Sequence, residues 1–209
     1  MGLRDRFNSF SGGTRFVVSR VFVHLVGQDV APLLGVLNQA VREVMEADGD
    51  MQVLGEQLAQ VCDRLLEYET FWRSAANEGD VTWDEGEAGD YVSDLFTDSA
   101  GRYGSSIDGA SGEPTNGASS NGVNGDEDWT IPITQNLVVI LTVAFEGEVP
   151  ELETSLADVE ALNAGLKALI NLHHRGTLRA VQIHFSPAQI GDDLPSDQLI
   201  EHFPELIPL

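Results

Sequence analysis

The chain has 209 residues, enough for one domain with a buried core or for two small halves that share one. Its 34 acidic and 11 basic residues give a formal net charge of −23, which repels phosphate backbones and excludes nucleic-acid binding through a broad basic surface. Cys62 is the only cysteine, which excludes an intrachain disulfide, and no apolar run approaches the roughly 20 residues of a membrane-spanning helix. We expect a soluble, cytoplasmic protein.

The first predicted element is a strand over residues 16–26, where β-branched and aromatic residues alternate with other side chains. A helix is the second interpretation, because such a short run is ambiguous. A helix should follow, with Asp29 at its N-cap and Pro32 in its first turn, where proline is tolerated. Asp48-Gly49 should end it.

A second helix is predicted from Asp50 to about Ala76. Its apolar positions alternate in steps of four and three, which is typical of one buried helix face. These positions are Leu54, Leu58, Val61, Leu65, Tyr68 and Trp72. Cys62 falls beside this stripe, so we expect it to be a small buried side chain.

A third helix should begin near Asp84, because Glu87 stands three residues later, as a capping box requires. Its buried face is predicted to consist of Tyr91, Val92, Leu95, Phe96 and Tyr103. Its exposed face should carry Asp90, Asp94 and Asp98.

Residues 104–128 are rich in glycine, serine and asparagine and contain no leucine or aromatic residue. Such a segment buries too little apolar surface to offset its ordering entropy, so it is predicted to be a disordered linker. It separates residues 1–103, a strand with helices, from residues 129–209. A linker of this length also lets the two halves pack on each other, so one composite domain stays open as an alternative.

The C-terminal half is predicted to be a strand–helix–strand–helix unit. The strands cover residues 137–145 and 178–185, and the helix between them should begin at Thr154 or Ser155 and end at Gly176. A unit of this length favours parallel strands. The last helix is predicted over residues 196–202. The fold class is therefore α+β: an N-terminal strand, three helices, the linker and this βαβα unit, with one small sheet that the halves can share.

The stretch from Glu78 to Asp98 is strongly acidic and contains no basic residue. A calcium site is conceivable, but the spacing is not that of an EF-hand loop, and capping together with a solvated helix face explains several carboxylates. The remaining interpretation is a docking surface for a basic partner, since Trp83 lies in a turn-rich connection where a large ring can anchor a protein. It can also simply fill the gap between two helices. The residues assigned to partner binding are Trp83, Asp84, Glu85, Glu87, Asp90 and Asp94.

The histidines and Cys62 show no catalytic spacing. His173 and His174 are adjacent on a helix and point in different directions, which makes a poor metal pair. A nucleophilic role for Cys62 would need a nearby base, and the sequence shows no signature for one. We therefore expect no enzyme, no cofactor and no metal.

The first residues combine apolar and basic side chains on one side of a short predicted helix. This arrangement is compatible with weak contact to a membrane surface, or with a frayed terminus. The membrane-contact residues of this hypothesis are Leu3, Arg4, Arg6, Phe7 and Phe10.

Four stretches resemble a known family. Leu65–Trp72 is similar to its paired leucines followed by an aromatic-Trp step, and Val139–Gly147 is similar to its apolar strand ending in Ala and an acidic turn. Residues 185–187 match an aromatic-x-Pro step, and Asp193–Leu206 resembles the closing Asp…Leu…Pro-x-Leu pattern. It is a cyanobacterial and plastid family of unknown function, whose plant members include a thylakoid protein that facilitates biogenesis of PsbB in photosystem II.

The membrane-integral members carry a transmembrane helix ahead of the first strand, where this chain has only Met1–Arg15. The resemblance therefore implies a soluble or peripheral, non-enzymatic assembly factor of an oxygenic phototroph, cytoplasmic or peripheral to the thylakoid. Its partner would be a photosystem subunit or an assembly intermediate. The alternatives are a metal-dependent hydrolase that uses carboxylates and histidines, and a soluble adaptor that never contacts membranes.

Overall fold

The computed structural model describes residues 13–108, 134–189, 192 and 194–209, the side chains of residues 103–108 excepted. The first elements are β1 (Phe16–Val26), the 3-10 turn η1 (Gln28–Val30), α2 (Ala31–Glu46), α3 (Met51–Glu67), the turn η2 (Glu69–Phe71), β2 (Trp72–Thr82) and α4 (Glu85–Asp108). They are followed by β3 (Asn136–Glu146), the turn η3 (Pro150–Leu152), α5 (Val159–Arg175), β4 (Leu178–Ser186), α6 (Ser196–His202) and β5 (Ile207–Pro208).

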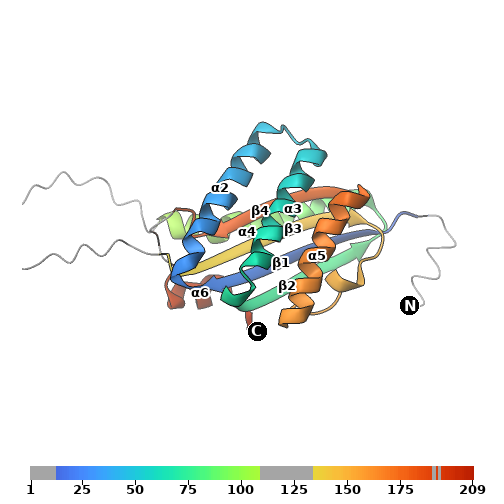
Figure 1. Cartoon of the computed structure of the whole chain (residues 1–209). Coiled ribbons are helices and arrows are strands. Elements are labelled where there is room, and N and C mark those ends of the chain that lie inside the picture. Colours follow the sequence, from blue (N-terminus) through green and yellow to red (C-terminus); the bar gives the residue numbers. More distant parts are fainter. Residues whose placement is uncertain (1–12, 109–133, 190–191, 193) are drawn as a thin grey trace, which may run out of the picture.

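The strands form one antiparallel sheet in the order β4–β3–β1–β2–β5 (Figure 1). β1 lies in the middle and pairs along its whole length with β3 and along nearly all of it with β2. The sheet therefore combines strands from before and after residues 109–133. The α+β class predicted from the sequence is confirmed.

The parallel arrangement predicted for β3 and β4 is wrong. The two strands pair antiparallel, with Phe145 opposite Leu178. The reason is the connection: residues 147–158 run back along the sheet, where the Asn77 side chain binds the backbone of Thr154 and Leu156. Helix α5 then returns to the end at which β3 finished, and the Glu146 N–H donates to the Thr177 carbonyl at 3.0 Å.

The helix predicted to run to Ala76 ends at Glu67, and residues 72–82 form β2 instead. The indole N–H of Trp72 donates to the Leu65 carbonyl at 3.1 Å, which satisfies one of the last carbonyl groups of α3. Pairing with β1 then satisfies the backbone beyond it and buries Ala75 and Ala76. Tertiary pairing overrides the helical pattern of the local sequence.

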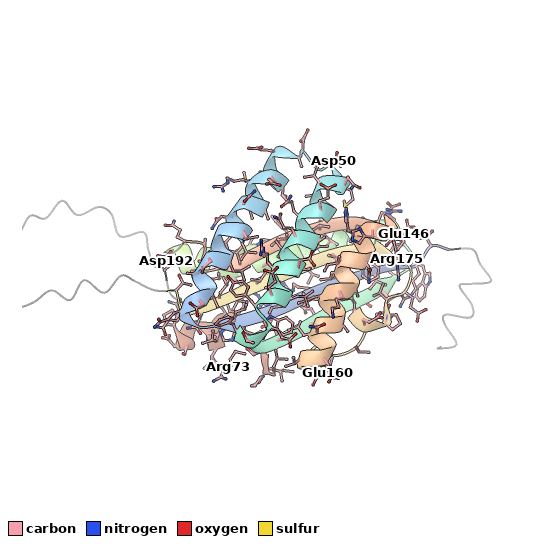
Figure 2. All side chains as sticks on the ribbon, viewed as in Figure 1. Asp50, Arg73, Glu146, Glu160, Arg175 and Asp192 are labelled. Atoms are coloured by element: carbon pink, nitrogen blue, oxygen red, sulfur yellow. The ribbon has the colours of Figure 1, made fainter. Side chains whose placement is uncertain are left out.

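Two helical layers enclose the sheet (Figure 1). Helices α2, α3 and α5 cover one face, where the larger core includes Val21, Leu37, Leu58, Leu141 and Leu166. Helices α4 and α6 lie on the opposite face, over two smaller clusters. Figure 2 shows Asp50, the N-cap of α3, at the tip of the α2–α3 hairpin, where its carboxylate accepts the Gln52 N–H at 2.8 Å.

Several predicted helix boundaries are also corrected. α2 begins after the turn η1, which contains Asp29, so Asp29 is not its N-cap. Asp158, rather than Thr154 or Ser155, caps α5 by accepting from the N–H groups of Glu160 and Ala161. The backbone of α4 continues to Asp108, into the segment expected to be a linker, because each added residue of a formed helix gains a hydrogen bond.

Candidate functional site

The start of α4 is fixed by hydrogen bonds among Thr82, Asp84 and Glu87. The Asp84 carboxylate accepts the Glu87 N–H at 3.0 Å, and the Thr82 hydroxyl donates to the Glu87 carboxylate at 2.6 Å. The Thr82 oxygen also accepts the Asp84 N–H at 3.2 Å. Half of the capping box predicted from the sequence is therefore present, because Glu87 bonds to the Thr82 hydroxyl and not to the Asp84 N–H. Both carboxylates serve to begin the helix.

The other acidic residues assigned to partner binding face solvent. Glu85, Asp90 and Asp94 are exposed on α4. None of their side chains has a hydrogen bond or an ion pair with the residues that the structure describes. Trp83 is partly exposed in the connection just before the helix. We name Trp83, Glu85, Asp90 and Asp94 the α4 acidic surface. Its carboxylates carry charge that no described cation neutralises.

An ion-pair network that sequence reasoning missed joins α4 to the sheet. Arg20, 3% exposed in the middle of β1, binds the carboxylates of Glu78 and Asp98. Arg102 binds Asp98 at 3.0 Å and Glu205 at 2.5 Å. Both guanidinium groups lie near the ring of Phe22, 5.0 and 5.6 Å from its centroid. The only sequence signal was an arginine in a mostly apolar strand.

The network sets the protonation of Asp98. Burial raises the pKa of this carboxyl, but the hydrogen bond from Arg20 and the charges of Arg102 and Arg20 outweigh it. The net result is a pKa below the ordinary value, so Asp98 is ionised at neutral pH. Asp98 is exposed, as predicted, and its carboxylate also connects α4 to Arg20 of β1.

A cavity of about 520 Å³ opens beside the outer edge of β2. Its lining includes Ser19, Gly79 and Leu152, together with carboxylates from Glu78, Asp80, Glu153 and Glu205. Two buried oxygen atoms of this lining, the Ser19 hydroxyl and Glu205 Oε2, have no hydrogen-bond partner among the described residues. Buried polar groups are normally bonded, so these atoms can accept a partner.

The opposite edge of the sheet is apolar. A groove of about 180 Å³ follows β4 between Met45 of α2 and Phe96 of α4, whose exposed fractions are 78% and 47%. The prediction that Phe96 is buried is wrong, because its ring packs on the side of α4 toward the edge strand, 5.4 Å from the ring of His184. Burial, followed by the charge of Arg20, lowers the pKa of His184.

The remaining candidate residues are accounted for by packing. Cys62 is fully buried, as predicted, and burial together with the charge of Asp63 raises the pKa of its thiol. Trp72, predicted on the buried face of the second helix, is 8% exposed, although it lies in β2. No group of three or more His, Cys, Asp or Glu side chains in the described ranges is arranged to hold a metal ion.

The comparisons with known proteins identify a family. A family model described as "Protein of unknown function (DUF1517)" matches residues 15–209. The chain belongs to the DUF1517 family. No curated protein and no solved structure matches the chain.

The DUF1517 match begins at Arg15, after the segment that carries the predicted membrane-contact residues. Leu3, Arg4, Arg6, Phe7 and Phe10 lie outside the described residues, as do residues 109–128 of the expected linker. Among the described helices, none combines the length and the apolar character needed to cross a membrane.

Proposed function

We propose that this DUF1517 protein is a non-enzymatic accessory or assembly factor that acts by protein–protein contact through the α4 acidic surface. The observation that carries the proposal is that some carboxylates on and beside α4 have structural partners and others have none. Asp84 and Glu87 cap the helix and Asp98 pairs with arginines, whereas Glu85, Asp90 and Asp94 have no partner among the described residues.

Unpaired carboxylates beside a partly exposed indole suit a basic protein partner. The charges would steer the encounter, and an aromatic ring such as that of Trp83 is a common anchor at interfaces. The net charge of −23 favours the same class of partner. The resemblance of several stretches to a cyanobacterial and plastid family supports the setting that we propose: an oxygenic phototroph, at or near the thylakoid, with a photosystem subunit or assembly intermediate as partner.

The test is co-purification of partners with tagged protein. Asp90→Lys/Asp94→Lys should remove the partners and leave the circular dichroism spectrum unchanged, because both side chains are exposed. Glu56→Lys/Asp63→Lys is the matched control: it makes the same charge change on exposed positions of α3, on the other face of the sheet. A partner list that is the same for both variants and the wild type would refute the assignment of the surface.

A further inference from the structure

We propose that the outer edge of β2 binds an extended, basic peptide segment of a partner protein as an added strand next to β5. This inference rests on the proposed function, because it too requires a protein partner, but it places a second contact on β2, away from the α4 acidic surface.

The outer edge of β2 is only partly paired. β5 covers Ser74 and Ala75, and the Leu209 N–H donates to the Arg73 carbonyl at 3.1 Å. Figure 2 shows Arg73 at this outer side of the sheet. Because backbone groups alternate between the two sides of a strand, those of Asn77, Gly79 and Val81 also point outward.

Beyond Ala75, β5 no longer pairs with the outward backbone groups of β2. Asp80 Oδ1 accepts the Val81 N–H at 2.7 Å, but the outward backbone groups of Asn77 and Gly79 have no partner among the described residues. A strand that continues the line of β5 would pair with them. Main-chain pairing of this kind gives affinity that does not depend on the peptide's side chains.

The side chains on the two faces of this edge differ in charge, and this difference predicts which side chains the peptide should carry. On the face of α4, Glu78, Asp98 and Glu205 pair with the guanidinium groups of Arg20 and Arg102, and Asp80 adds a fourth carboxylate to the cavity lining. Glu205 Oε2 is buried there without a partner. Arginine or lysine side chains of an added strand would supply the missing positive charge and donors.

On the opposite face, the cavity lining mixes apolar side chains with polar ones, among them Asn77 and Thr154. Val17, Val81 and Leu152 line it, and the unpartnered Ser19 hydroxyl, on a residue that is 1% exposed, lies in its wall. Gly79 pairs with Ser19 across the two strands and adds no side chain to this face. Since strand side chains alternate between faces, the peptide should alternate basic residues with small apolar or hydroxyl residues.

The probe is the fluorescein-labelled peptide Thr-Arg-Val-Arg-Val-Arg, titrated with the full chain and followed by fluorescence anisotropy. We expect saturable binding, with amide exchange slowed at Asn77 and Gly79. A peptide with glutamate in place of arginine should not bind. A peptide N-methylated at alternate amides keeps its charge but cannot pair, and it should bind about tenfold more weakly.

Asp80→Lys and Asp90→Lys are the matched variants, because they change the charge equally and only Asp80 lines the cavity. Asp80→Lys should weaken peptide binding about tenfold, and Asp90→Lys should do so far less. Equal effects of the two variants, equal binding of the N-methylated peptide, or no binding at all would overturn strand addition. The proposed role of the α4 acidic surface is tested separately: it would be refuted if the Asp90→Lys/Asp94→Lys variant kept its cellular partners.

Discussion

The guanidinium group of Arg20 lies 2.6 Å from the carboxylate of Asp98, Nη1 to Oδ2, and this contact connects the central strand to α4. Arg20 Nη1 also donates to the Ser99 hydroxyl at 3.1 Å and to the Leu95 carbonyl at 3.3 Å. One buried side chain therefore orients the helix that carries the α4 acidic surface. The site depends on this contact even though Arg20 is not part of it.

Arg20→Met should destabilise the protein by about 3 kcal/mol, because it removes a buried cation, leaves Glu78 without its partner and leaves Asp98 with Arg102 alone. Urea unfolding measures the loss. Arg64→Met is the control, since the Arg64–Glu67 pair is exposed on both sides and should contribute at most about 1 kcal/mol. Equal losses in the two variants would contradict the structural role of Arg20.

Two glycine-to-alanine changes should have opposite effects. A Cβ on Gly79 would lie 2.3 Å from the Val18 carbonyl oxygen, so Gly79→Ala must separate β1 from β2 and should cost about 1–3 kcal/mol. A Cβ on Gly89 meets nothing within 4 Å, so Gly89→Ala should stabilise α4 by about 0.5–1 kcal/mol. Thermal melting curves of the two variants test both signs.

His24 should make stability depend on pH. Burial lowers its pKa, the hydrogen bond with Asn136 opposes this, and the charge of Arg73 adds to it. The folded protein therefore binds this proton less readily than the unfolded chain, and stability should fall as the pH drops below about 6.5 toward the lowered pKa.

Comparing histidine variants with the wild type separates the contribution of His24 from the effect of the many carboxylates on the pH dependence of stability. His24→Gln should show a smaller loss between pH 7.5 and 5.5 than the wild type, measured as the free energy of unfolding in urea. His174→Gln, at an exposed position near the end of α5, should behave like the wild type. If the free energy of unfolding of His24→Gln depended on pH as that of the wild type does, His24 would not be the source of the pH dependence.

Cys62 should be unreactive in the folded protein. Its side chain is fully buried and burial raises the pKa of the thiol, so thiolate is scarce and a reagent cannot reach it. Native protein should resist labelling by a disulfide reagent at pH 8 and be labelled rapidly in urea. Fast labelling without denaturant would mean that α3 opens readily or that Cys62 is more exposed than the structure shows.

The elements with regular patterns were predictable from the sequence. The strands predicted over residues 16–26, 137–145 and 178–185 and the helix over residues 196–202 match β1, β3, β4 and α6. The alternation of side chains in the strands and the prolines beside the helix are signals that can be read from neighbouring residues alone. The α4 cap at Asp84 and Glu87 was also local, because it depends on residues three positions apart.

The features missed depend on distant residues. β2 contains Ser74, Ala75 and Gly79, which are poor strand formers, and it exists because β1 pairs with it and buries it. The direction of β4 depends on the return path of residues 147–158, which no periodicity encodes. Likewise, the cavity beside β2 and the Arg20 network join segments that are more than 50 residues apart, so no motif could reveal them.

The most direct test of the central claim is photo-crosslinking in the native cell. A photo-reactive phenylalanine derivative would replace Trp83, and in a second strain it would replace the exposed Gln60 on α3 as a control. The account predicts a discrete adduct with a protein from position 83, lost in the Asp90→Lys/Asp94→Lys background, and none from position 60. Absence of an adduct at position 83, or the same adducts from both positions, would contradict protein contact through the α4 acidic surface.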